Sequence, residues 1–228
     1  MVEAIAERLT VVREKIEAAC ARAGRSVDSV TLIAVTKTFP AAVVEQAIAA
    51  GLRDFGENKV QELTAKAAAI PPEKCRWHMI GHLQRNKARQ VVRCADTFHA
   101  LDSRRLAAAL DRQAKAQDRV LPCFVQVNVS REPTKSGFLA EDVGSFLMSI
   151  GQWDNLKPVG LMTLAAHWQS GQDVRGQFRQ MRQLRDRYEH LGGTALSMGM
   201  SGDYELAIAE GATHIRVGSA IFGPRTRY

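Results

Sequence analysis

The chain has 228 residues, of which 46% are hydrophobic and 24% charged, and this composition excludes a disordered or fibrous protein. Its net charge of +7 would suit a nucleic-acid partner if the basic residues were clustered. The densest basic region, residues 175–187, instead alternates with apolar residues at helical spacing, which predicts the solvated face of an amphipathic helix. We therefore expect no specific nucleic-acid partner.

The N-terminal region and the cysteines bear on location. Charged residues interrupt the first 24 positions, which argues against a signal peptide, and no apolar run is long enough for a membrane span. A cytoplasmic protein without a membrane partner is expected. The cysteines are scattered, with no C-x-x-C pair and no histidine at zinc-finger spacing, so we expect reduced thiols and no bound metal.

Predicted helices and strands alternate along the chain. An apolar stripe at Ile5, Leu9, Val12 and Ile16 predicts a first helix over residues 3–23. Strands are predicted at residues 31–37, 52–55, 76–81, 97–101, 121–129, 157–164, 194–198 and 213–218. Helices are predicted between them at residues 41–50, 57–68, 84–93, 103–116, 140–150, 173–191 and 203–210.

Strands that alternate with helices indicate βαβ units and a parallel sheet. Eight such units in a chain of this length favour an α/β fold closed as a single (β/α)8 barrel of the TIM type over an open doubly wound sheet. No linker rich in Pro, Gly or Ser divides the chain. We expect one domain over residues 1–228, with an extra helix within residues 1–24 and the barrel over residues 31–223.

The first predicted strand, TLIAVTK, ends in a lysine. Alternation places Ile33, Val35 and Lys37 on one face, and if the first two fill the barrel interior, the amine emerges at its C-terminal mouth. Partial burial would lower the pKa of that amine, and a neutral amine is what a Schiff base with an aldehyde requires. Taken alone, Lys37 has a simpler interpretation as a strand-end residue whose amine reaches water.

Small residues follow the last two predicted strands. They are Gly199, Ser201 and Gly202 after the seventh strand, and Gly218, Ser219 and Gly223 after the eighth. Barrels commonly bind phosphate at these loops, through backbone N–H groups and the start of a short helix, although either loop alone could be an ordinary turn. Together with Lys37 they favour a phosphorylated aldehyde as ligand, and pyridoxal 5′-phosphate (PLP) has both groups.

Arg216 shares a face of the last predicted strand with His214 and Gly218. A guanidinium at this position could donate a hydrogen bond to a pyridine nitrogen, and because it cannot accept a proton it would leave that nitrogen unprotonated. Such a ring is a weaker electron sink for carbanion chemistry. The alternative is that Arg216 pairs with a carboxylate inside the barrel.

These residues belong to a larger pattern. The chain resembles the pyridoxal phosphate homeostasis proteins, or YggS/PROSC family, and the resemblance implies the fold of the alanine racemase N-terminal domain, which is fold type III among PLP-binding proteins. The motifs are LIAVTK at 32–37, FGENKVQE at 55–62, WHMIGHLQRNK at 77–87, VNVSREPTKSGF at 127–138, GLMTL at 160–164 and the glycine-rich segment 196–223. Two departures are Lys59, where relatives often have tyrosine, and Ala165 and Ala166, where a proline is common.

The resemblance implies that PLP is the cofactor and that Lys37 holds it as an internal aldimine. It also implies a set of cofactor-binding residues: Lys37, Asn58, His78, Met200, Ser201, Arg216, Gly218 and Ser219. Arg216 would face the pyridine nitrogen and Asn58 would lie beside the ring. For His78, a hydrogen-bonded core imidazole is an equally good interpretation. No metal pair with His82 is expected, because no carboxylate or thiol recurs nearby at ligand spacing.

Efficient racemisation would need a second base. Tyr188, Tyr204 and Tyr228 offer no evident one, so no catalytic residue is assigned. The resemblance implies a PLP-binding protein of vitamin B6 homeostasis that sequesters PLP or delivers it to PLP-dependent apoenzymes, and a monomer is expected. Two alternatives stay open: a PLP-dependent racemase or lyase of low activity, and a nucleic-acid-binding protein. A cofactor-free aldolase that uses Lys37 is a third, but it would not explain Arg216.

Overall fold

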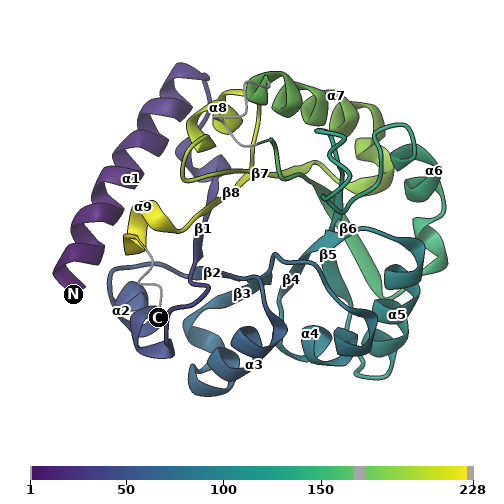
Figure 1. Cartoon of the computed structure of the whole chain (residues 1–228), viewed down its shortest axis with the longest axis horizontal. Helices are drawn as coiled ribbons and strands as arrows, with labels where there is room; N and C mark the ends of the chain where they lie inside the picture. The colour runs from purple at the N-terminus through teal and green to yellow at the C-terminus, as the bar shows by residue number, and fades with distance from the viewer. Residues whose placement is uncertain (1, 167–172, 225–228) are drawn as a thin grey trace.

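Eight parallel strands close into one barrel, joined in chain order, in the computed structural model, which describes residues 2–166 and 173–224 (Figure 1). The strands are β1 (Thr31–Val35), β2 (Asp54–Glu57), β3 (Arg76–Met79), β4 (Thr97–Leu101), β5 (Leu121–Gln126), β6 (Leu156–Met162), β7 (Ala195–Met200) and β8 (His214–Val217). β1 closes the ring by pairing with β2 and with β8, where Ile33 lies opposite Arg216. The predicted barrel and the existence of each predicted strand are thereby confirmed.

Helices surround the strands on the outside of the barrel (Figure 1). They are α1 (Val2–Arg22), α2 (Ala41–Ala49), α3 (Val60–Ala69), α4 (Ala88–Cys94), α5 (Arg104–Lys115), α6 (Val143–Met148), α7 (Val174–Gly192), α8 (Tyr204–Ala209) and α9 (Ser219–Phe222). Short 3-10 turns are η1 (Val27–Ser29), η2 (Pro72–Lys74), η3 (Arg85–Lys87) and η4 (Ile150–Gln152). No helix among the described residues combines the length and apolar character needed to cross a membrane.

The extra helix α1 packs beside α8 and α9, outside the barrel (Figure 1). Its predicted apolar stripe is the packed face, since Ile5, Leu9, Val12 and Ile16 are all buried. Each such side chain contributes about 1.5–3 kcal/mol when it is fully removed from water. These four contacts explain why a helix outside the βα repeat is fixed against the barrel.

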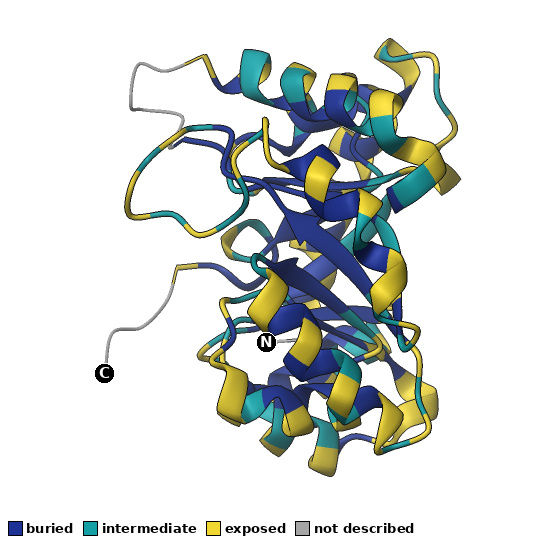
Figure 2. Ribbon diagram, turned by 90° about the vertical axis from the view of Figure 1, so that its right-hand side faces the viewer, coloured by how far each residue is buried: buried dark blue, intermediate teal, exposed yellow. Residues whose placement is uncertain are grey.

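The main core lies between the strands and the helices. Figure 2 shows buried residues on the strands and on the inner faces of the helices, with exposed residues on the outer faces. The barrel interior is different, because it holds buried polar side chains, among them His78, His99, Ser197 and Arg216. An interior of this kind is stable only when its polar groups are hydrogen-bonded to one another.

The predicted boundaries around β2 are wrong. The sequence pattern ended this strand at Phe55 and began the next helix at Glu57, but β2 runs to Glu57 and α3 begins at Val60. An acidic residue followed by a helical apolar pattern is typical of a helix start. Here the Glu57 side chain is fully buried and paired with Lys66, a contact that periodicity does not reveal.

The basic face of α7 is partly exposed, as predicted, but its arginines also have a buried partner. Arg175, Arg179 and Arg182 converge on Glu210, with N–O distances of 2.7, 3.5 and 3.0 Å. The Glu210 side chain is only 3% exposed, so three partly exposed guanidiniums surround one buried carboxylate. The densest part of the positive charge is therefore partly neutralised within the fold.

Candidate functional site

A cavity of about 530 Å³ opens at the C-terminal ends of the strands, and Lys37 lines it. Val35 lines the same cavity and ends β1, so the strand is two residues shorter than predicted and Lys37 lies in the turn that follows it. Thr38 has a φ of 72°, in the left-handed region, so the chain turns sharply just after the lysine. The turn leaves Lys37 half-buried at the barrel mouth.

The backbone on the N-terminal side of Lys37 is held by a buried cluster. The Thr36 hydroxyl donates to Glu57 Oε1 at 2.6 Å, and Lys66 Nζ donates to the Thr36 carbonyl oxygen at 2.8 Å. Lys66 Nζ also lies 2.5 Å from Glu57 Oε1. Burial raises the pKa of Glu57, and the hydrogen bonds from Lys66 and Thr36 only partly offset it.

The backbone on the C-terminal side of Lys37 is held by α3, the helix that carries both Glu62 and Lys66. The Thr38 N–H donates to Glu62 Oε2 at 2.5 Å, and Glu62 lies 3.6 Å from Lys66. Both neighbours of Lys37 are thus fixed by side chains of β2 and α3. Sequence reasoning missed Glu57, Glu62 and Lys66, although their spacing on FGENKVQELTAK placed them near Asn58.

The two small-residue loops meet at the cavity. Ser201 and Gly202 follow β7, Gly218 and Ser219 follow β8, and all four line the cavity with Lys37. The Gly218 N–H donates to Ser201 Oγ at 3.2 Å, which joins the loops. A Cβ on Gly218 would lie 3.2 Å from the Val35 carbonyl oxygen, so a larger residue would crowd β1.

Arg216 lies in the cavity wall formed by β8 and is 3% exposed. Its Nη1 donates to Ser197 Oγ at 2.6 Å and its Nη2 to the Thr163 carbonyl oxygen at 2.8 Å. Its hydrogen bonds among the described residues therefore go to a hydroxyl and a backbone carbonyl, whereas the sequence left a carboxylate partner open. Burial lowers the pKa of Arg216 to about 10, with Asp203 acting in the opposite direction, so the side chain is charged at neutral pH.

Asn58 and Met200 complete the predicted set at the cavity. Asn58 follows β2, and its Oδ1 is buried without a hydrogen-bond partner among the described residues. An unpaired buried oxygen costs free energy, so a donor on a bound molecule would stabilise this side chain. Met200 ends β7, where its N–H donates to Asp203 Oδ1 at 2.6 Å.

His78 has a different position from the other predicted residues. It does not line the cavity with Lys37; its Nδ1 lies 2.9 Å from His99 Nε2 and its Nε2 lies 2.9 Å from Asp54 Oδ1. The imidazole is thus hydrogen-bonded inside the barrel, which was the second interpretation of this residue. His99 and Ser197 were missed, and their signal was a polar residue at an interior position of an apolar strand.

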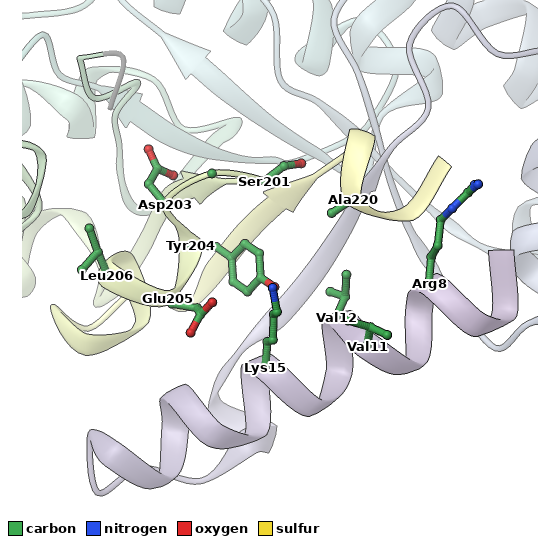
Figure 3. A pocket seen from close by; sticks show the side chains of 11 residues that line it. Arg8, Val11, Val12, Lys15, Ser201, Asp203, Tyr204, Glu205, Leu206 and Ala220 are labelled. Carbon is green, nitrogen blue, oxygen red and sulfur yellow. The ribbon is translucent and has the colours of Figure 1, made fainter. Parts of the chain in front are cut away.

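A second cavity of about 550 Å³ lies outside the barrel, between α1 and the segment after β7. Ser201 and Asp203 line both cavities. Figure 3 shows Lys15 of α1 pointing toward the ring of Tyr204. Tyr204 therefore belongs to this outer cavity and does not line the cavity that contains Lys37.

Comparisons with known proteins identify the family of this chain. The family model for the alanine racemase N-terminal domain matches residues 9–226. A pyridoxal phosphate homeostasis protein of Aquifex aeolicus is 38% identical over 96% of this chain and 97% of its own, and one of Escherichia coli K12 is 41% identical over 97% of each. The chain belongs to the pyridoxal phosphate homeostasis protein family.

A solved structure of the same family supports the fold and the ligand. PipY of Synechococcus elongatus, solved with PLP bound, is 40% identical and superposes with a TM-score of 0.82. The match covers 96% of this chain and 100% of the PipY chain. This protein is therefore structurally similar to a barrel whose solved structure contains bound PLP.

Proposed function

We propose that this protein binds PLP in the cavity that contains Lys37 and acts in vitamin B6 homeostasis. The observation that carries the proposal is that Lys37, the two small-residue loops and Arg216 line one cavity. These are an amine for the aldehyde of PLP, hydroxyl and backbone donors for its phosphate, and a guanidinium for its ring nitrogen. The family relatives named for PLP homeostasis and the PLP-bound PipY support the same ligand.

The residues present fit this cofactor. Asn58 Oδ1 is buried and has no hydrogen-bond partner among the described residues. Gly218 leaves its part of the cavity wall without a side chain, and a Cβ there would crowd the Val35 carbonyl oxygen. We propose that Lys37 holds PLP through a Schiff base, that Ser201, Gly218 and Ser219 contact its phosphate, and that Asn58 and Met200 lie beside its ring. When bound, PLP supplies an electrophilic carbonyl carbon and an electron-withdrawing ring.

The same residues favour binding over turnover. Arg216 can only donate, so it would leave the ring nitrogen unprotonated and the ring a weaker electron sink. Racemisation also needs an acid or base on each face of the cofactor, and neither Tyr188 nor Tyr204 lines the cavity with Lys37. Tyr228 lies outside the described residues. A racemase or lyase of low activity is the second candidate, supported by the match to the alanine racemase domain.

The decisive experiment is a visible absorption spectrum of the purified protein with added PLP. Wild type should show the absorption band of a PLP Schiff base. Borohydride should reduce that imine and leave the cofactor covalently attached to the peptide that contains Lys37. Lys37→Ala should lose both signals, whereas Lys59→Ala is a matched control outside the cavity and should keep them. A wild-type protein that stays colourless in excess PLP would refute the proposal.

Delivery and weak catalysis need separate assays. If the protein delivers PLP, the loaded form should reactivate a PLP-dependent apoenzyme faster than its spontaneous release of PLP allows. Equal rates would leave sequestration as the only role. Alanine racemisation at a rate comparable to a true racemase would favour the enzyme. The cytoplasmic location and the monomeric state expected from the sequence remain part of the proposal, and light scattering of the eluted protein tests the second.

A further inference from the structure

A continuous chain of hydrogen bonds runs through the barrel interior, away from the cavity that contains Lys37. It begins at Arg216 of β8 and passes to Ser197 of β7, with Nη1 to Oγ at 2.6 Å. It continues from Ser197 Oγ to His99 Nδ1 of β4 at 2.9 Å. It then passes from His99 Nε2 to His78 Nδ1 of β3, also at 2.9 Å.

The chain of hydrogen bonds ends at the opposite mouth of the barrel. His78 Nε2 lies 2.9 Å from Asp54 Oδ1, and Arg76 holds both oxygens of that carboxylate, at 2.8 and 2.7 Å. Asp54 and Arg76 begin β2 and β3, and both line a separate cavity of about 490 Å³. Because the strands are parallel, their first residues lie at the end of the barrel opposite Lys37.

The chemistry of the two end residues, Arg216 and Asp54, sets the direction of the hydrogen bonds. A guanidinium can only donate, so Ser197 Oγ accepts from Arg216. The other partner of Ser197 Oγ among the described residues is Nδ1 of the neutral His99 ring, so the hydroxyl hydrogen is donated to that nitrogen. The His99 proton is then on Nε2 and is donated to His78 Nδ1, which leaves the His78 proton on Nε2 for Asp54. Each hydrogen bond therefore points from the cavity toward Asp54.

Burial keeps this arrangement free of competing partners. His99 and Ser197 are fully buried, and His78 is 4% exposed. Burial lowers the pKa of His99, with His78, His214 and Arg216 acting in the same direction, so the ring is neutral and has one donor and one acceptor. The hydrogen bonds from His78 and Arg76 outweigh burial and lower the pKa of Asp54 to about 2, which keeps the terminal acceptor ionised.

We propose that Ser197, His99, His78 and Asp54 are positioning residues that fix the guanidinium of Arg216 at the wall of the cavity. Two of the Arg216 nitrogens are held by Ser197 and Thr163, so its remaining donors are directed in one fixed orientation. Loss of the Ser197 hydroxyl frees one side of the fork. The inference rests on the proposed function only for the identity of the ligand.

His214 provides a matched control. Its ring lies inside the barrel, 6.1 Å from the His99 ring and 6.5 Å from the His78 ring between centroids. Among the described residues its ring hydrogen-bonds Thr213 Oγ1, at 2.9 Å, so His214 lies beside the chain of hydrogen bonds without being part of it. His214→Phe changes the interior by one imidazole and leaves every link from Arg216 to Asp54 in place.

The first test uses the protein without added PLP. Nitrogen-15 spectra of labelled histidine should show His99 and His78 protonated on Nε2 only, and protonation on Nδ1 of either ring would overturn the proposal. Exchange of the Arg216 guanidinium protons with water should become at least about tenfold faster in Ser197→Ala, since one hydrogen bond is lost. Ser197→Thr, which restores a hydroxyl, and His214→Phe should both keep the wild-type rate.

The second test measures the dissociation constant for PLP and the absorption maximum of the bound form. Ser197→Ala should bind about tenfold more weakly, the loss expected for one hydrogen bond from a charged donor, with a shifted maximum. Unchanged exchange or an unchanged dissociation constant in this variant would overturn the proposal. If wild type does not bind PLP at all, the proposed function fails, and the proton-exchange and histidine spectra still judge the positioning role. The wild-type histidine spectrum remains decisive if Ser197→Ala does not fold.

Discussion

Glu57 and Lys66 form an ion pair of 2.5 Å inside the protein, with side chains only 0% and 6% exposed, and both contact the residue that precedes Lys37. Removal of one partner leaves the other charge buried and unpaired, so Lys66→Met should lower the free energy of unfolding by about 3–5 kcal/mol. The double variant Glu57→Leu with Lys66→Met should cost less than the sum of the single variants. Urea unfolding measures all three, and strictly additive costs would contradict the coupling.

Arg216 should not tolerate replacement by lysine, although the charge is kept. The two fixed hydrogen bonds, to Ser197 and to the Thr163 carbonyl, use the fork geometry of the guanidinium, which an ammonium lacks. We expect Arg216→Lys to weaken PLP binding at least about tenfold, as measured by absorbance titration. Equal affinity in wild type and variant would show that charge alone is sufficient at this wall.

His214 should make the protein less stable in mild acid. Burial lowers its pKa to about 4, against about 6.5 for an unfolded histidine, so the unfolded state binds the proton first as pH falls. Stability should therefore decrease from pH 7 downward, by about 2 kcal/mol at pH 5 for this group. His214→Phe should flatten the pH dependence of urea unfolding, and an unchanged slope would assign the effect to other groups, with His99 the first to test.

Gly81 should be intolerant of even a methyl group. A Cβ at this position would lie 2.2 Å from the Asn58 carbonyl oxygen, so Gly81→Ala must displace the backbone that carries Asn58 into the cavity. We expect a loss of about 1–3 kcal/mol in stability. Gly151→Ala is the control, because a Cβ there meets nothing within 4 Å. Similar thermal unfolding midpoints for both variants would contradict this account.

Much of the fold could be predicted from the sequence, because alternating patterns depend on local geometry. The eight strands, the first helix and the position of Lys37 near the C-terminal end of β1 follow from side-chain periodicity, although β1 ends at Val35 and not at Lys37. Boundaries were less accurate where a charged residue is buried. Glu57 is the clearest case, since its polarity suggested a helix start and only its partner Lys66, on the next helix, allows it to lie within a strand.

Local patterns in the chain were enough to predict that eight βα units follow a helix, and that a lysine, two small-residue loops and an arginine lie at or near the C-terminal ends of strands, because each feature depends on the local order of residues. Which of these residues share a cavity, and how they are held there, depends on the folded barrel. Closure of the barrel brings β2, β3, β4, β7 and β8 around one interior, so Asp54, His78, His99 and Ser197 meet Arg216 across large sequence separations. Hydrogen bonds between distant residues need exact placement in space, and no local pattern encodes it.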